Sequence, residues 1–308
     1  MLVCPHCRVP LARRDRVLRC GSCEREYPID ASGIADFAEG SYFDIFDETT
    51  SELTPEHREG LANEMSGAAA RIDDYYLPLI RSRVPAPPRI LDSGCGNGLS
   101  VDILMRAGLD AWGHDLSALR KWQWREREHR DRLVVADALR LPFPDASFDF
   151  VLSSGVIEHL GVSEMGGATY SVEPLPSRDT VRREYIRELV RVARGSLFID
   201  CPNGAFPIDF WHGPRAGGAR WHSPREGFLA TYGQIARLAR EVDPALRVRA
   251  LSPHRRLRFE QVGRHWYGRA FAVPADVLLR LMNVVPWLAR SPLNPYLVVE
   301  ISRTGGAA

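Results

Sequence analysis

Three glycines and one acid within residues 89–100, Arg-Ile-Leu-Asp-Ser-Gly-Cys-Gly-Asn-Gly-Leu-Ser, have the types and spacing needed to bind a small charged ligand. Gly94, Gly96 and Gly98 permit a tight turn that brings a ligand close to bare backbone. Asp92, just before the turn, suits a ligand with an ammonium group better than one with a pyrophosphate. The G-x-G-x-G spacing is one residue shorter than the dinucleotide fingerprint G-x-G-x-x-G, so it disfavours an NAD-dependent oxidoreductase.

Two further acids end apolar runs that are expected to be strands. Asp115 follows Ala-Trp-Gly-His, 17 residues beyond Gly98, where a carboxylate would accept hydrogen bonds from both hydroxyls of a ribose. Asp137 follows Leu-Val-Val-Ala in the same way. Each acid taken alone could cap a helix or lie in a surface turn. Together with Asp92, they predict a nucleoside ligand at the carboxyl edge of a sheet.

Four cysteines near the start of the chain have the spacing of metal ligands. Cys4-x2-Cys7 is followed after twelve residues by Cys20-x2-Cys23. In a reducing compartment this spacing indicates a metal site, not a disulfide framework. Four thiolates close a tetrahedral zinc site, which is structural because it leaves no open position. A segment as small as residues 1–40 cannot build a core without such a staple, so we predict a zinc ribbon there.

The glycine stretch also carries a family resemblance. Leu-Asp-Ser-Gly-Cys-Gly-Asn-Gly (91–98) resembles motif I of class I S-adenosylmethionine-dependent methyltransferases, and Gly-Val-Ile-Glu-His-Leu (155–160) resembles the Glu-His-Leu segment of their type 11-like members. The resemblance is good over the first half of residues 89–303 and loose after 160. It implies S-adenosylmethionine as cofactor, with an Asp-Ala pair at the end of the third strand reaching the adenine amine. The implied cofactor-binding residues are Asp92, Gly94, Gly96, Gly98, Asp115, Asp137, Ala138 and Ser153.

Methyl transfer from a sulfonium needs in-line positioning and a base that removes the proton of the acceptor. Glu158, His159 and His222 belong to loops expected at the carboxyl edge of the sheet, and His222 is the first choice as base. Alternatively, Glu158 caps a helix while the histidines pack or hydrogen-bond a loop. Some family members pair a Glu-x-x-Glu-His run with a later His to hold magnesium. Here Gly155 replaces the first glutamate and removes an oxygen ligand, which argues against a catalytic metal. Whether the reaction uses a metal stays open.

The candidate cofactor-binding and catalytic residues can lie together only if a sheet brings their loops to one edge. The pattern predicts a Rossmann-like seven-stranded α/β sandwich, mostly parallel with an antiparallel edge strand. We expect three parts: the ribbon (1–40), a helical lead-in and linker (41–88), and the methyltransferase domain (89–303) with irregular substrate insertions near 161–178 and 204–225. The predicted strands are 89–91, 111–115, 133–138, 150–154, 196–200, 247–251 and 296–302. The predicted helices are 99–108, 117–130, 182–192, one from the Ser-Pro-Arg-Glu run at 223–226 to about Glu241, and 276–289.

Composition narrows the acceptor and the location. The net charge of +1 gives no case for nucleic acid, and the segment that contains Glu158 and His159 resembles one that is common in enzymes acting on small molecules, quinones, lipids and glycans. We therefore expect a small-molecule, glycan or lipid-type acceptor. Oxygen is the atom expected to be methylated, with nitrogen and carbon left open. The ribbon alone supports the alternative, an rRNA base methyltransferase or a module that binds RNA or protein. No apolar run approaches the ~18 residues of a membrane span, although the apolar helix at 276–289 would suit peripheral contact with lipid. The first five residues lack the features of a secretory signal, so we expect a cytoplasmic protein. The oligomeric state stays open.

Overall fold

The computed structural model describes residues 2–44, 46, 65–83, 87–165, 171–213, 219–257 and 266–303. The chain divides into two units, and each is described by itself. The first unit comprises Met1–Ser153, Arg187–Leu197 and Ala308; the second comprises Ser154–Ile186 and Phe198–Ala307. The predicted lead-in (41–88) and the two predicted insertions lie partly outside the described residues.

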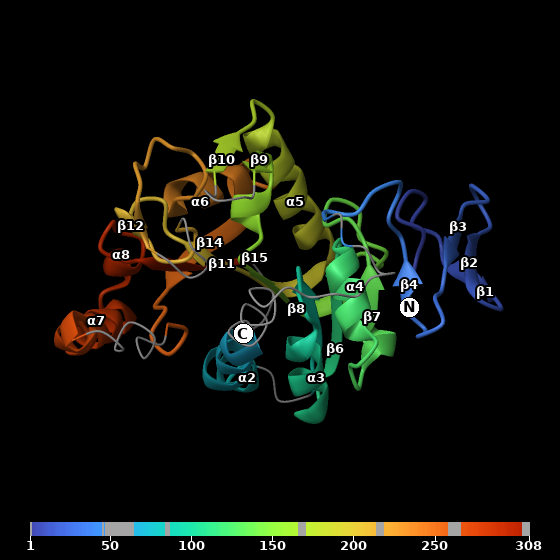
Figure 1. Cartoon of the computed structure of the whole chain (residues 1–308), viewed down its shortest axis with the longest axis horizontal. Helices are drawn as coiled ribbons and strands as arrows, with labels where there is room; N and C mark the ends of the chain where they lie inside the picture. The colour runs from blue at the N-terminus through green and yellow to red at the C-terminus, as the bar shows by residue number, and fades with distance from the viewer. Residues whose placement is uncertain are drawn as a thin grey trace. The chain divides into compact units, whose positions relative to one another are not determined.

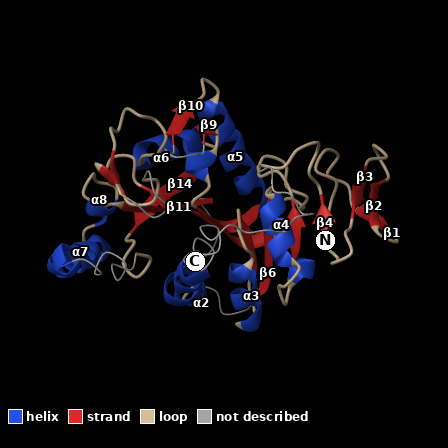
Figure 2. Cartoon of the chain, in the orientation of Figure 1, coloured by secondary structure: helices blue, strands red, loops and turns tan. Residues whose placement is uncertain are grey.

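The main sheet has the strand order β14-β15-β11-β8-β5-β6-β7-β4. Figure 1 labels these strands except β5, and Figure 2 draws the strands in red. In the first unit, β5 pairs in parallel with both β8 and β6, and β7 pairs in parallel with β6. The α/β sheet of the expected family is therefore present, and the predicted strands agree with the observed ones to within a few residues. The bounds are β5 (Arg89–Ser93), β6 (Asp110–Asp115), β7 (Leu133–Val135) and β8 (Phe148–Ser154).

The described sheet holds eight strands instead of the predicted seven. The extra strand, β4 (Ala35–Asp36), follows the ribbon and pairs in parallel with β7. Lys121 Nζ lies 2.8 Å from Asp36 Oδ2, and Tyr42 donates its hydroxyl to the same oxygen at 2.6 Å. This buried ion pair fixes a strand that is too short to show any periodicity in the sequence.

The cysteine segment contains a small antiparallel sheet with the order β1-β2-β3 (Figure 2), in which Cys20 ends β2 while Cys4, Cys7 and Cys23 lie outside the strands. Its register pairs Leu11 with Cys20 and Leu18 with Tyr27. The Val3 N–H donates to Pro142 O at 3.0 Å, which connects the start of the chain to the loop before β8. The bounds are β1 (Leu11–Arg14), β2 (Val17–Cys20) and β3 (Glu26–Pro28).

The helices of the first unit follow the glycine turn and β6. The helix predicted at 117–130 is shorter: α4 ends at Trp124, whose indole N–H donates to Gly96 O at 2.7 Å and is thereby held in the core. After this residue the chain turns, and the His129 N–H donates to Asp102 Oδ1 at 2.9 Å. The bounds are η1 (Arg71–Tyr76), α2 (Leu77–Arg81), α3 (Leu99–Arg106), α4 (Ala118–Trp124) and η2 (Arg130–Arg132).

Three local predictions for the later part of the chain were wrong. Residues 161–178 contain a β-hairpin, because β9 and β10 pair antiparallel. The helix expected to start near residues 223–226 starts at Tyr232, where Thr231 and Gln234 form a capping box. The single helix predicted at 276–289 is two helices, because Val285, which precedes Pro286, is not helical; α7 ends at Val284 and α8 begins at Pro286.

The remaining elements complete the fold (Figure 1). β14 pairs antiparallel with β15, which gives the predicted antiparallel edge. In the described residues, no helix is both long and apolar enough to cross a membrane. The bounds are η3 (Ile157–His159), β9 (Val162–Met165), β10 (Ser171–Pro174), α5 (Arg178–Val192), β11 (Ala193–Pro202), β12 (Ile208–Asp209), β13 (Arg220–Trp221), α6 (Tyr232–Val242), β14 (Leu246–Leu251), α7 (Trp266–Val284), α8 (Pro286–Ala289) and β15 (Tyr296–Arg303).

Candidate functional site

The glycine turn joins β5 to α3 and folds back on β6. Gly94, Gly96 and Gly98 have φ angles of +73°, +55° and +77°, which side chains other than glycine rarely adopt. The N–H groups of Gly94 and Cys95 both donate to His114 O, at 3.0 and 2.9 Å. The turn is therefore tied to the end of β6, and α3 begins directly after Gly98.

Asp92 lies at the end of β5 and has no exposed surface. Its Oδ2 accepts a hydrogen bond from Arg71 Nη2 at 3.0 Å and another from the Ser100 hydroxyl. Arg71 comes from η1 and Ser100 from the first turn of α3, so the carboxylate joins three elements. A buried carboxylate requires such charged and polar partners. The sequence pattern did not identify Arg71 or Ser100 as part of this site.

Asp115 and Gly96 come together as the spacing predicted. The Gly96 N–H donates to Asp115 Oδ2 at 3.0 Å, and the Leu116 N–H donates to Asp115 Oδ1 at 2.8 Å. A Cβ atom on Gly98 would lie 2.7 Å from Leu133 Cδ1, so packing also requires glycine at this position. The acid at the end of β6 thus lies directly against the glycine turn.

The other predicted cofactor residues lie on the neighbouring strands or just after them. Ser153 is buried and is the register partner of Ser93 at the end of β8. Asp137 and Ala138 follow β7; Asp137 is exposed, and its Oδ1 accepts the Leu139 N–H at 2.9 Å. Strands β5, β6, β7 and β8 run parallel, so all these residues lie at the same edge of the sheet.

A histidine that the sequence analysis did not single out lies beneath this edge. His114 Nε2 is 2.8 Å from the Ser93 hydroxyl, and Nδ1 is 3.3 Å from Ala136 O. Complete burial lowers the pKa of His114 to about 4, so the ring is neutral at pH 7. His114 thereby links β5, β6 and the end of β7 without placing a charge in the sheet.

A second group of polar side chains lies in the other unit. Glu158 and His159 lie on η3, just after β8, and His212 lies after β12. One ligand atom from each of the three lies within 4.8 Å of the others. The rings of His159 and His212 meet edge to face, with centroids 5.4 Å apart. The structure therefore brings two predicted catalytic residues together with a histidine that had not been predicted.

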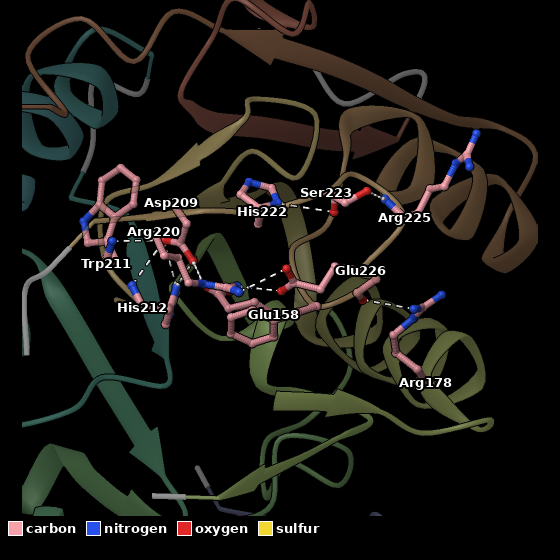
Figure 3. A network of polar contacts seen from close by, with 12 residues as sticks. Glu158, Arg178, Asp209, Trp211, His212, Arg220, His222, Ser223, Arg225 and Glu226 are labelled. Atoms are coloured by element: carbon pink, nitrogen blue, oxygen red, sulfur yellow. Dashed lines mark hydrogen bonds and ion pairs between the residues drawn. The ribbon is translucent and has the colours of Figure 1, made fainter. Parts of the chain in front are cut away.

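The β12–β13 hairpin positions His212. Asp209 pairs with Arg220 across the hairpin, and its buried carboxylate lies 3.0 and 3.1 Å from His212 Nδ1 (Figure 3). Arg220 Nε donates to Asp209 Oδ2 at 3.2 Å, and its guanidinium also forms two bonds with Glu226. Burial alone would raise the pKa of Asp209, but hydrogen bonds and charge from His212 outweigh it and lower the pKa to about 2. Asp209 is therefore a fixed anion behind the His212 ring.

Glu158 is almost completely buried, and burial raises its pKa. In the part of the chain that the structure describes, no group donates a hydrogen bond to its Oε2. The Glu158 carboxylate forms no helix cap, contrary to one of the alternatives considered above. The backbone of Glu158 is held by Arg182, which donates to Glu158 O at 3.0 Å and to Phe228 O at 2.6 Å.

His222 lies beside Trp221 on the same hairpin that carries Asp209 (Figure 3). Its backbone N–H donates to Pro207 O at 3.1 Å, and its Nδ1 lies 3.4 Å from Ser223 O. A ring that donates from Nδ1 carries its lone pair on Nε2. Nε2 is buried and has no hydrogen-bond partner among the described residues. The free lone pair on Nε2 could therefore accept a proton. The sequence had not predicted that His222 lies outside the group formed by Glu158, His159 and His212.

The four cysteines of the ribbon converge as their spacing predicted. Their sulfur atoms all lie within 4.8 Å of one another, with Cys4 Sγ and Cys23 Sγ 3.7 Å apart. The N–H groups of Ser22 and Cys23 both point to Cys20 Sγ at 3.4 Å. The Cys23 N–H is the main cause that lowers the pKa of Cys20 to about 7. Together, the four sulfurs suit a tetrahedral metal ion.

Comparisons with known proteins identify the region around the glycine turn. Residues 91–195 match the family described as Methyltransferase domain. A probable S-adenosylmethionine-dependent methyltransferase of Mycobacterium tuberculosis is 31% identical over 116 residues, which is 37% of this chain and 35% of that protein. The demethylmenaquinone methyltransferase of Corynebacterium urealyticum is 32% identical over 141 residues, 40% of this chain and 60% of that protein.

A third relative, the 27-O-demethylrifamycin SV methyltransferase of Amycolatopsis mediterranei, is 31% identical over 134 residues, which is 39% of this chain and 48% of that protein. The chain thus spans between 35% and 60% of the length of these relatives. The family match and these relatives agree on the region that contains the glycine turn, β6, β7 and β8.

Proposed function

We propose that this chain, which carries a methyltransferase domain over residues 91–195, transfers a methyl group from S-adenosylmethionine to an oxygen of a small-molecule, glycan or lipid-type acceptor. The observation that carries this proposal is the direct bond between Asp115 and the backbone of Gly96. It places an acid at the end of β6 against a glycine turn that opens a helix. This arrangement suits a nucleoside at the carboxyl edge of a parallel sheet.

Each end of the cofactor has suitable partners along this edge. Asp92, an anion next to the turn, would attract the ammonium group of the methionine part. Asp115 would accept hydrogen bonds from the two ribose hydroxyls, and Asp137 and Ala138 would contact the adenine. The remaining predicted contacts, which come from backbone or a small hydroxyl, are Gly94, Gly96, Gly98 and Ser153.

The reaction needs little beyond alignment and proton removal. The acceptor oxygen attacks the methyl carbon, the bond from this carbon to sulfur breaks, and its electron pair stays on sulfur to give S-adenosylhomocysteine. The acceptor hydroxyl loses its proton to a base. His222 is the proposed base, because its Nε2 is buried, has no hydrogen-bond partner among the described residues and carries the lone pair when Nδ1 donates to Ser223 O.

Two observations favour an apolar or ring-bearing acceptor over RNA. Relatives include proteins named for demethylmenaquinone and for 27-O-demethylrifamycin SV, and the second name specifies an oxygen. In addition, α7 and the residues just after it expose large apolar side chains in a region that a lipid-type acceptor could contact. These exposed residues are Val273, Val277, Leu281, Val284 and Trp287.

The ribbon would hold one structural zinc through Cys4, Cys7, Cys20 and Cys23. All four positions would be occupied by protein thiolates, so this ion would supply no chemistry to the transfer. Zinc analysis of freshly purified protein should give one metal that is lost in Cys20→Ser. Freshly purified protein without zinc would contradict the assignment.

Incubation of small-molecule extracts with labelled S-adenosylmethionine, followed by intact-mass analysis, should reveal an acceptor that gains one methyl group. With that acceptor, His222→Ala should slow single-turnover transfer by about 100-fold or more, the usual contribution of a general base. His254→Ala is the matched control, because this histidine pairs with Asp276 on α7. If His222→Ala keeps the wild-type rate, another group takes the proton; if only RNA is labelled, the acceptor class is wrong.

A further inference from the structure

We propose that the outer face of α7, continued by α8, binds the surface of a membrane that contains anionic phospholipid. Both helices belong to the second unit and contact one another (Figure 1). The proposal does not depend on the proposed methyltransferase function. The side chains of α7 that carry it are apolar and exposed, and together they are called the apolar face: Val273, Val277, Leu281 and Val284.

The apolar face lies on the side of α7 that the unit does not cover. Its members recur at intervals of four, four and three residues, which places them on one side of a helix. Val273 is 69% exposed and Val284 is 74% exposed. Leu279 and Met282, on the opposite side, are only 2% exposed and pack in a core cluster with Ala289. A helix on the surface of a soluble domain needs one apolar stripe, so the second stripe of α7 has no role in the packing of this unit.

Contacts on the inner side fix the direction in which the apolar face points. The Ser252 hydroxyl donates to Leu279 O at 2.5 Å, and His254 Nε2 lies 3.3 Å from Asp276 Oδ1. After α8, the side-chain amide of Asn294 donates to Ala289 O at 2.7 Å. A rotation of α7 that buried the outer stripe would break these contacts and expose the core cluster instead.

The chain around the apolar face is strongly basic. Residues 252–295 contain seven arginines and two acids, a net charge of +5, whereas the whole chain has a net charge of +1. Arg256 pairs with Asp200, and Arg280 pairs with Asp276. Arg255 and Arg290 are exposed and form no ion pair with any described residue. Basic side chains next to an exposed apolar helix face are typical of helices that lie on anionic lipid.

Trp287 extends the exposed apolar surface into α8. It lies three residues beyond Val284, and 59% of its surface is exposed. Tryptophan is enriched where a bilayer meets water, because its ring is apolar and its N–H is polar. Arg290, one helical turn later, would reach the lipid phosphates while Trp287 enters the acyl boundary.

A membrane surface fits these features better than a second copy of the chain or an RNA. A two-fold dimer through α7 would bring the same basic segment of both copies together, so that like charges would face one another. RNA would neutralise the arginines but would leave the apolar face in water. An anionic bilayer accepts both the apolar side chains and the positive charge.

The test is flotation of the full-length protein with lipid vesicles. We expect binding to vesicles of phosphatidylcholine and phosphatidylglycerol, and at least about 10-fold weaker binding to phosphatidylcholine alone. Val277→Ser/Val284→Ser should weaken binding to the anionic vesicles about 10-fold or more, because two apolar side chains no longer enter the lipid. Arg290→Gln should weaken it about fivefold. Leu175→Ser is the matched control: this leucine is 42% exposed on the turn before α5, and the variant should bind like the wild type.

The serine variants separate lipid binding from folding, because valine and serine have similar helix propensities and both positions are exposed. Circular dichroism should show the same helix content in all variants. No binding to the anionic vesicles, equal binding to both kinds of vesicle, or wild-type binding by Val277→Ser/Val284→Ser would each overturn the proposal. A wild-type dimer that this double variant converts to a monomer in light scattering would show that a second copy covers the face. Competition by monomeric short-chain phosphatidylglycerol would show a pocket for a single lipid instead of a surface for a bilayer.

Discussion

Asp92 and Glu158 are both carboxylates almost completely shielded from solvent, yet their surroundings differ. Asp92 accepts hydrogen bonds from Arg71 and Ser100. Glu158 Oε2 accepts no hydrogen bond from any described residue, and the buried arginine next to it, Arg182, binds backbone oxygens instead. The first carboxylate joins three elements of its own unit through Arg71 and Ser100. Among the described residues, the second has no buried arginine bound to it, and the charged groups that counteract the effect of burial on its pKa are the neighbouring His159 and His212. Burial alone therefore does not distinguish a structural acid from a functional one; the partners do.

The largest effect is expected at Asp92. Replacing it with alanine removes the buried anion to which the guanidinium of Arg71 donates, so Asp92→Ala should lower the free energy of unfolding by about 3–5 kcal/mol. Urea unfolding followed by circular dichroism measures this. Asp131→Ala, which removes an exposed carboxylate, should change stability by no more than about 0.5 kcal/mol. Equal losses in the two variants would show that Asp92 has no special structural role.

A smaller effect is expected from His114. Its folded pKa of about 4 lies below the value of about 6.5 in the unfolded chain, so the unfolded state binds the proton more tightly. Stability contributed by the neutral ring is complete above pH 6.5 and falls as the pH decreases towards 4. At pH 5 the loss should be about 2 kcal/mol relative to pH 8. His114→Gln should remove this part of the pH dependence, and an unaltered pH profile in the variant would contradict it.

The smallest effect is expected at Glu158. Glu158→Gln keeps the shape but removes a charge that no hydrogen bond at Oε2 compensates in the described chain. Without added metal, the variant should therefore unfold within about 1 kcal/mol of the wild type, or be slightly more stable. The same urea titration used for Asp92 gives the comparison. A loss above about 2 kcal/mol would mean that Glu158 is a structural acid like Asp92.

The sequence identifies the glycine turn well because its determinants are contiguous. Gly94, Gly96 and Gly98 report positive φ angles directly, and the apolar runs before Asp92 and Asp115 predict the strands that bring these acids to one edge. The cysteines are identified for the same reason, because each Cys-x2-Cys pair is local. Residues that are close together in the sequence determine each of these features.

His212 could not be identified in this way. It joins Glu158 and His159 only because the β12–β13 hairpin pairs Asp209 with Arg220, and neither two-residue strand has a visible period. The Asp-x-x-His spacing from Asp209 was the one local signal. Strand β4 was missed for a similar reason, since the Asp36 pair with Lys121 links distant parts of the chain. The pairing of short strands that are far apart in the sequence is the feature of the fold that residue patterns do not predict.

The central claim is that the first unit binds S-adenosylmethionine at the glycine turn. Titration calorimetry of the full-length protein with this cofactor tests it most directly, with Asp115→Ala as the variant. The account predicts one cofactor bound per chain, and an affinity about 10- to 150-fold weaker in Asp115→Ala, because a charged acceptor of hydrogen bonds is worth about 1.5–3 kcal/mol. No heat of binding in the wild type, or the same affinity in Asp115→Ala, would contradict it.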